Sequence, residues 1–349
     1  MNLEGEGKDV EKLCFKSFSG FSEKHKLPVA KPKNRKKTAK PWQINGDFDV
    51  GNGTFVTTGG KNFYVSKNLK ADALPYSDVV AEPRGGFVAT DNGGGHSWFL
   101  NSRECKTTVW DSDTVSPPIS EKFVLVSSGK SYSLTENSAA VFEKGAVTFL
   151  SDTGEALTKL TEYMLPDGLG KRYELEIKNK GKGEKKFTAI TDFDLSLGVM
   201  PNYGFYLIEK HPHGVSAKNI RNGVGCYLEL PDEAEPVTDA GKIKSRTDVG
   251  EYYSKNRSLN LKCFASALEF SLSENESKRF CYTLYPSAEE AEKHFGKTPS
   301  KALQTEKWEA LNPVKIISAD KNLALLFDNL PYQTLSSRIN ARAAYYQVG

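Results

Sequence analysis

The sequence has few cysteines and no long apolar segment. An odd, scattered set of thiols without a CxxC pair argues against a disulfide framework and is typical of reduced cysteines in a cytoplasmic protein. No apolar run approaches the roughly 20 residues that a membrane-spanning helix needs. The first six residues lack the charged-then-apolar order of a secretory signal. We therefore expect a cytoplasmic protein that does not bind a membrane. The cysteines are Cys14, Cys105, Cys226, Cys263 and Cys281.

Charge of either sign is not in excess, because 47 basic residues face 44 acidic ones. This balance argues against nucleic-acid binding by the main body. Five basic residues do cluster between positions 31 and 37, within a polar N-terminal segment that we interpret as a solvated arm without a core of its own. His211 and His213 are an isolated pair on an expected turn, and no metal-ligand spacing is present. We expect neither a metal nor a cofactor.

Residues 41–285 show the period of two that is typical of β-strands. It is clearest at 171–178, where Tyr173, Leu175 and Ile177 share one face. A turn-rich stretch separates this strand from another at 187–193, so the sequence predicts that these two strands form a hairpin. Many short strands without intervening helices indicate a mainly β protein built from antiparallel sheets packed face to face. Further strands are expected at 47–50, 63–65, 123–127, 140–142, 147–150, 225–230, 262–268 and 278–284.

The period becomes helical after Pro286. Ser287 and Glu290 form a capping box at the start of one helix. Trp308 lies on the apolar side of a second expected helix, and Pro331 suits the first position of the last one, where a missing N–H costs little. The expected helices are 288–295, 298–311, 319–330 and 331–349. The expected domains are a basic arm at 1–40, a β-sandwich at 41–285, a helical linker at 286–330 and the start of a helical domain at 331–349.

The segment 93–113 concentrates groups suited to recognising a sugar. Trp98 and Trp110 offer flat apolar faces with one N–H donor each. Arg103 and Glu104 offer planar forks of donors and acceptors, and Asn101 adds an amide. We take these five residues as the candidate substrate-binding site. The alternative is that the indoles are core aromatics and that Arg103 and Glu104 form a surface pair.

The run from Pro83 to Pro118 resembles the N-terminal domain of family 94 glycoside phosphorylases. That family has a glycine-rich hairpin, a Tyr-Thr-Trp, an Asn-Ser-Arg-Glu and a Trp-x-Asn-Asp run. Asn101–Glu104 matches the third of these, whereas His96 stands where a tyrosine is usual. A second match spans 323–349, and its core at 330–342 resembles the first helix of the family's catalytic domain. The β-1,2-glucan branch is most similar, and the resemblance covers residue 41 to the end. Further departures are Cys105 and the Asp111-Ser112-Asp113 sequence.

This resemblance implies a super-sandwich of the galactose-mutarotase type, linker helices and the first helix of an (α/α)6 barrel. In the family, the catalytic aspartic acid and the phosphate site lie beyond the position of Gly349. The implied function is therefore the scaffold portion of a phosphorylase acting on β-glucans or β-gluco-oligosaccharides. This chain alone is expected to have no catalytic residue, and inorganic phosphate is the co-substrate of the complete enzymes. Expected partners are the glucan, a second copy in a homodimer and a separate chain that supplies the barrel.

Two other functions stay open at this stage. One is a free-standing carbohydrate-binding module that uses the five candidate residues. The other is a self-sufficient glycoside hydrolase, for which Asp192 and Asp194 share a strand face. Alternation of acids with apolar residues is also typical of a half-exposed strand, and no base or nucleophile is specified, so the hydrolase is disfavoured. Other candidate carboxylates are Glu104, Asp111 and Asp113. The polar residues expected to pack against the barrel are Gln333, Arg338 and Arg342.

Overall fold

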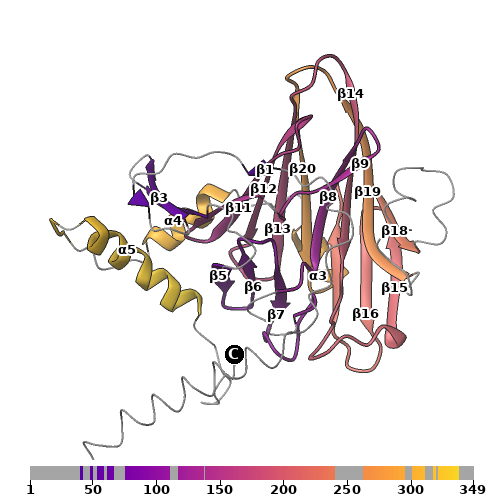
Figure 1. Cartoon of the computed structure of the whole chain (residues 1–349). Coiled ribbons are helices and arrows are strands. Elements are labelled where there is room, and N and C mark those ends of the chain that lie inside the picture. Colours follow the sequence, from indigo (N-terminus) through magenta and orange to yellow (C-terminus); the bar gives the residue numbers. More distant parts are fainter. Residues whose placement is uncertain are drawn as a thin grey trace, which may run out of the picture. The chain divides into compact units, whose positions relative to one another are not determined.

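Figure 1 shows a computed structural model of the chain of 349 residues. It describes residues 40–41, 48–49, 53–58, 61–66, 75–110, 117–136, 138–239, 262–294, 301–310, 317–319 and 321–337. All of these lie in the unit Lys37–Gly349. The expected arm at 1–40 falls almost wholly outside the described residues, as do Asp111, Asp113, Arg338 and Arg342.

One large antiparallel sheet contains twelve of the described strands, in the order β15-β16-β17-β20-β13-β12-β11-β10-β4-β3-β2, with β1 paired to β11. Neighbours along the chain are mostly neighbours in this sheet, as expected for short turn connections. The strands are β1 (Lys40–Pro41), β2 (Phe48–Asp49), β3 (Gly53–Thr58), β4 (Lys61–Ser66), β10 (Ala139–Glu143), β11 (Ala146–Asp152), β12 (Ala156–Met164), β13 (Lys171–Asn179), β15 (Tyr206–His211), β16 (Gly214–Asn219), β17 (Gly225–Glu229) and β20 (Ser277–Tyr285).

Two smaller antiparallel sheets accompany it. A five-stranded sheet has the order β18-β19-β14-β8-β9, and a three-stranded sheet has the order β5-β6-β7. The prediction of a mainly β, antiparallel sandwich is therefore confirmed. The strands are β5 (Ser77–Glu82), β6 (Gly85–Thr90), β7 (Gly95–Phe99), β8 (Glu121–Ser127), β9 (Lys130–Ser133), β14 (Lys185–Phe193), β18 (Glu235–Asp239) and β19 (Lys262–Leu272), with a short 3-10 helix η1 (Tyr203–Phe205).

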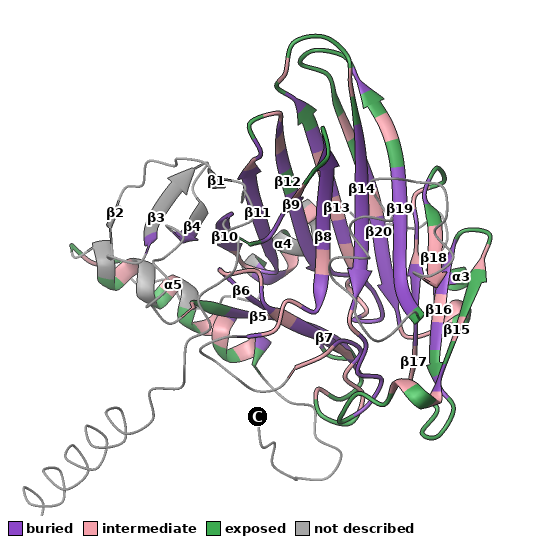
Figure 2. Ribbon diagram, turned by 45° about the vertical axis from the view of Figure 1, so that its right-hand side comes forward, coloured by how far each residue is buried: buried purple, intermediate pink, exposed green. Residues whose placement is uncertain are grey.

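The core lies between the twelve-stranded and five-stranded sheets. Phe123 of β8 reaches across to Tyr173 of β13 and Tyr282 of β20, with ring centroids 5.1 and 5.7 Å apart. Along β13, Tyr173, Leu175 and Ile177 are buried on one face, as the alternation predicts, and Figure 2 shows the buried strands in purple. Each such side chain contributes about 1.5–3 kcal/mol when fully buried.

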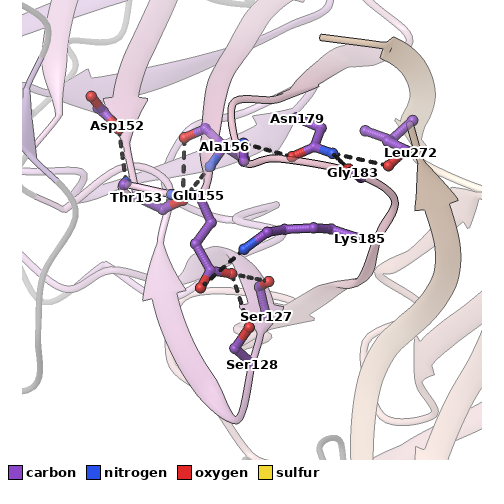
Figure 3. A network of polar contacts seen from close by, with 12 residues as sticks. Ser127, Ser128, Asp152, Thr153, Glu155, Ala156, Asn179, Gly183, Lys185 and Leu272 are labelled. Carbon is purple, nitrogen blue, oxygen red and sulfur yellow. Dashed lines mark hydrogen bonds and ion pairs between the residues drawn. The ribbon is translucent and has the colours of Figure 1, made fainter. Parts of the chain in front are cut away.

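The predicted hairpin of 171–178 with 187–193 is wrong. β13 pairs with β12 and β20, whereas β14 pairs with β8 and β19, so the turn between them crosses from one sheet to the other. Asn179, which is fully buried at this crossing, holds the turn: its amide donates to the carbonyl oxygens of Gly183 and Leu272 at 2.9 and 3.0 Å (Figure 3). Local turn signals predict a reversal of the chain but not which strand becomes the partner.

Three helices follow the strands: α3 (Ala288–His294), α4 (Lys301–Ala310) and α5 (Lys321–Ser336). The Ser287 half of the predicted capping box is confirmed, since the backbone N–H of Glu290 donates to the Ser287 hydroxyl at 3.3 Å, whereas the Glu290 carboxylate accepts from Lys293 Nζ at 2.7 Å. The predicted break at residue 331 is wrong, because α5 runs through Pro331. Proline removes one helical hydrogen bond, and the burial of Tyr332 one residue later offsets this cost by docking the helix. No helix among the described residues is long and apolar enough to cross a bilayer.

Candidate functional site

The candidate site begins on β7, the edge strand of the three-stranded sheet. Trp98 pairs with Gly86 of β6, and a Cβ atom at position 86 would lie only 2.6 Å from the Trp98 ring. Glycine at this position therefore lets the indole lie flat on the sheet. His96, two residues earlier on the same face, pairs with Val88.

His96 joins the two tryptophans that the sequence singles out. Its ring lies 4.9 Å from the Trp110 ring in a stacked arrangement and 5.2 Å from the Trp98 ring in a tilted one. The imidazole is 6% exposed and its Nδ1 has no hydrogen-bond partner in the described residues, while both indoles are half-buried. Burial lowers the pKa of His96 to about 3, so the ring is neutral at physiological pH. We call His96, Trp98 and Trp110 the aromatic cluster.

The polar candidates lie on the loop that follows β7. Leu100 adopts a left-handed backbone conformation with φ 67°, and Asn101 Oδ1 accepts the backbone N–H groups of Arg103 and Glu104, both at 2.8 Å. The Asn101 carbonyl therefore shapes the loop, as asparagine does in many turns. Arg103 Nε and Glu104 Oε1 are 3.7 Å apart, and both side chains are exposed. The surface-pair alternative describes their position, and such a pair contributes at most about 1 kcal/mol.

A buried polar cluster, which the sequence analysis did not identify, lies on the opposite side of β7. Ser97 donates its hydroxyl to Glu121 Oε1 at 2.5 Å, and Thr108 donates to the same atom at 2.8 Å. Glu121 Oε2 accepts from Lys171 Nζ and from the Tyr173 hydroxyl, each at 2.6 Å. These contacts join all three sheets, because Ser97, Glu121 and Lys171 come from β7, β8 and β13.

The charge of this cluster is carried by one ammonium between two carboxylates. Lys171 Nζ lies 2.8 Å from Glu162 Oε2 and 4.0 Å above the Phe87 ring. Burial favours the neutral form of each group, but the two carboxylates outweigh it and raise the pKa of Lys171. Burial likewise acts against ionised Glu121, yet the charge of Lys171 and the hydrogen bonds from Lys171, Ser97 and Tyr173 hold its pKa below the usual range. For Glu162 burial dominates and raises the pKa.

The sequence does contain a signal for this cluster. Lys171 has the same strand parity as Tyr173 and Leu175, so it points inward with them. A lysine at an inward position needs an anionic partner. Since Lys171 is 2% exposed and Glu121 is 8% exposed, the cluster is closed to substrate and acts as a structural clamp between the sheets.

The two carboxylates proposed for a hydrolase do not form a paired site. Asp192 on β14 is 1% exposed. Asp194 lies just beyond the strand and accepts from Lys122 Nζ at 2.6 Å. A hydrolytic pair needs both carboxyl groups on the substrate. Of the other candidates, Glu104 is exposed beside Arg103.

Residues 62–214 match the family model "Glycosyl hydrolase 94, supersandwich domain". This part of the chain is therefore similar to the supersandwich domain of a family of carbohydrate-active enzymes. The match includes all three strands of the small sheet and all five candidate residues.

Several solved structures are similar at low identity. A protein named as a kojibiose phosphorylase from the human microbiome is 10% identical, with a TM-score of 0.38, covering 78% of this chain and 37% of that one. A bacterial glucoamylase complexed with acarbose is 13% identical, with a TM-score of 0.38 and coverages of 85% and 39%. A protein named as an aldose 1-epimerase from Escherichia coli K12 is 7% identical, with a TM-score of 0.36 and coverages of 60% and 98%. The chain thus spans 37% of the length of the kojibiose phosphorylase. No curated protein matches the sequence.

Proposed function

We propose that this chain is the scaffold portion of a glycoside phosphorylase that acts on β-glucans or β-gluco-oligosaccharides. A separate helical body supplies the catalytic acid and the phosphate site, with inorganic phosphate as co-substrate and no cofactor. The match of residues 62–214 to a supersandwich domain supports the family of the complete enzyme. The linkage of the glucan rests on the sequence resemblance to the β-1,2-glucan branch.

One observation on α5 carries the scaffold role. Leu323, Phe327 and Leu330 are 40%, 37% and 43% exposed, and their spacing of four and three residues places them on one side of the helix. An isolated surface helix normally turns such a stripe toward the core. We call these three residues the α5 stripe.

The opposite side of α5 is attached to the sandwich. Tyr332 is 4% exposed and its hydroxyl donates to the Val79 carbonyl of β5 at 3.3 Å. Asp328 Oδ2 accepts from Lys144 Nζ at 2.7 Å. A helix that is fixed on one side and apolar on the other can bind a second helical surface through its apolar side. The contacts with the sandwich and the α5 stripe therefore lie on opposite sides of the helix.

The closed polar cluster is not a candidate for the catalytic site. A phosphorylase needs a proton donor for the leaving oxygen and an anion site for phosphate. The Glu121 carboxylate, although surrounded by donors, is buried and already accepts four hydrogen bonds. We therefore assign it to the fold rather than to chemistry.

An assay in two arms tests the proposal. The purified chain, incubated with inorganic phosphate and a β-linked glucose disaccharide, is expected to form no glycosyl phosphate. Addition of a separately produced helical catalytic domain of this kind of phosphorylase is expected to start the reaction. Glycosyl phosphate formed by the chain alone would contradict the proposal.

Binding between the two proteins tests the α5 stripe. Phe327→Asp places a charge in the contact and is expected to weaken association at least tenfold, equivalent to about 1.4 kcal/mol. Ile317, fully exposed in the segment before α5, provides the control variant Ile317→Asp, which is expected to bind as the parent does. Equal binding by both variants would remove the α5 stripe from the interface.

The aromatic cluster favours a second function, a carbohydrate-binding module. Two half-buried indoles lie against one imidazole, Trp110 stacked and Trp98 tilted, beside a loop that exposes Arg103 and Glu104. Titration of the chain with β-1,2- and β-1,4-linked gluco-oligosaccharides is expected to show binding that Trp98→Ala and Trp110→Ala each weaken. Arg103→Gln tests whether the loop after β7 contributes to sugar binding separately from the aromatic cluster. Binding that neither tryptophan variant changes would reject this function.

A further inference from the structure

The attachment of α5 to the sandwich includes a buried acid. Asp78, on the edge strand β5, is 2% exposed, and its Oδ1 accepts from Gln333 Nε2 of α5 at 2.6 Å. The adjacent Tyr332 hydroxyl donates to the carbonyl of Val79. The end of α5 is therefore fastened at a carboxyl group whose partner on the helix is a neutral amide.

The same strand provides an internal comparison. Glu82 lies four residues after Asp78, so both side chains leave β5 on the same face. Glu82 accepts from the Lys307 ammonium of α4. Asp78 makes no ion pair with any of the described residues. The two helices are thus held at one strand by acids in different electrostatic settings, α4 through an ion pair and α5 through an amide.

The other ionisable groups around Asp78 offer it no compensating charge. Two are phenols, whose own pKa values are raised mainly by burial and in part by Asp78. The lysines that contact β5 or α5 are engaged by other carboxylates, Lys307 by Glu82 on β5 and Lys144 by Asp328 on α5. The groups concerned are Tyr76 before β5, Glu82 on β5, Asp91 at the end of β6, which accepts from the Tyr76 backbone, Glu162 on β12, Lys307 on α4, and Tyr332 on α5.

The ionisation of Asp78 follows from this setting. Burial raises its pKa to about 7, although the Gln333 amide and the Val79 N–H act in the opposite direction. An exposed aspartate titrates near 3.8, so the docked form binds the proton more tightly than a form in which Asp78 meets water. The proton's contribution to docking is complete below pH 4 and is lost as the pH rises through 7.

We propose that Asp78 and Gln333 form a pH-sensitive latch that holds α5 on β5 when the carboxyl is protonated and loosens it when the carboxyl ionises. The latch acts on the C-terminal end of α5, where Gln333 lies, because neither the Lys144–Asp328 pair earlier on α5 nor the Lys307–Glu82 pair of α4 needs a proton. Since α5 carries the α5 stripe, pH governs how firmly that surface is presented. The inference concerns the chain alone and stands without the proposed function.

Hydrogen exchange of the chain by mass spectrometry, between pH 4.5 and 8.5 and corrected for intrinsic rates, tests the latch. Peptides from α5 are expected to lose protection between about pH 4.5 and 7, by up to tenfold per pH unit, because Asp78 releases one proton on opening in this range, and the protection is expected to level off above pH 7, where Asp78 is ionised in both forms. Peptides from β13 report global opening and are expected to stay unchanged. Asp78→Asn keeps an oxygen for Gln333 and is expected to remove the pH dependence. Protection of α5 that is flat with pH in the parent, or equally steep in Asp78→Asn, would overturn the proposal.

A second variant covers the case in which Asp78→Asn does not fold. Gln333→Lys places an ammonium where the amide stands and converts the contact into the ion-pair type seen at Glu82. It is expected to keep α5 protected at pH 8.5. Lys307→Gln is the matched opposite change and is expected to give α4 the pH dependence that α5 has in the parent. If Gln333→Lys loses α5 protection between pH 4.5 and 7 as the parent does, the latch is wrong. No sugar, phosphate or partner takes part, so this outcome is independent of the phosphorylase assay.

Discussion

Two lysine–carboxylate pairs in this protein have the same length and opposite surroundings. Lys171 Nζ and Glu121 Oε2 are 2.6 Å apart in the core, and Lys180 Nζ and Asp152 Oδ2 are 2.6 Å apart at the turns beyond the strands. The side chain of Lys171 is 2% exposed and that of Lys180 is 49% exposed. Equal distances therefore do not imply equal contributions to stability, because the effect of removing one partner depends on whether water can replace it.

The core pair predicts the largest effect. Lys171→Met leaves the Glu121 and Glu162 carboxylates together in a buried site, and breaking such a pair costs about 3–5 kcal/mol. The free energy of unfolding, measured by urea titration and circular dichroism at pH 7, is expected to fall by this amount. The fall is expected to shrink at pH 5, where protons can neutralise the orphaned acids.

The control for this variant removes part of the excess negative charge. Adding Glu162→Gln to Lys171→Met is expected to recover some of the lost stability, since one buried carboxylate is then absent. A loss of unfolding free energy below 1 kcal/mol for Lys171→Met would mean that the core pair stabilises the protein no more than the surface pair does.

The crossing between the sheets predicts an intermediate effect, because its central group is buried but uncharged. Asn179 donates to three carbonyl oxygens, those of Gly183, Leu272 and Ser273, and its own oxygen accepts the Gly181 N–H at 2.8 Å. Asn179→Ala is expected to cost about 1–3 kcal/mol, the usual cost of unsatisfied buried groups. Asn179→Asp keeps the acceptor for Gly181 but turns an anion toward three carbonyls, so it is expected to cost more than alanine at pH 7. Urea unfolding of both variants measures the order, and an aspartate variant as stable as the parent would contradict it.

Alternation along one strand could be predicted from the sequence, whereas the pairing between strands could not. Tyr173, Leu175 and Ile177 are buried as predicted, because a period of two fixes the face on which a side chain lies. The partner of that strand depends on the fold as a whole: both faces of β14 are buried from Phe187 onward, so its pattern contains no local preference for either sheet. For α5 the rule that proline begins a helix predicted a break at Pro331, and tertiary contacts overrode it.

For the candidate site, too, the sequence predicted some features and not others. The residue types indicated Trp98 and Trp110, and the fold brings both to the imidazole of His96. Their exposure and the role of His96 depend on packing between strands, which the sequence pattern leaves open. Asn101 matched a family motif, yet its oxygen is occupied by the backbone of its own loop, a role that only three-dimensional geometry reveals.

Removal of the surface pair is expected to have the smallest effect on stability. Lys180→Met removes the ammonium from Asp152, but Asp152 Oδ1 still accepts the Gly154 N–H at 2.7 Å and water can solvate the freed carboxylate. The expected loss is below about 1 kcal/mol and is expected to vanish in 0.5 M salt, which screens the pair in the parent. Lys171→Met should show no such salt dependence, because ions do not reach the core. If unfolding measurements gave Lys180→Met the larger loss of stability, burial would not explain the difference between the two pairs. The neighbouring turn contacts of Glu155 with Ser127 and Lys185 (Figure 3) would then have to depend on Lys180.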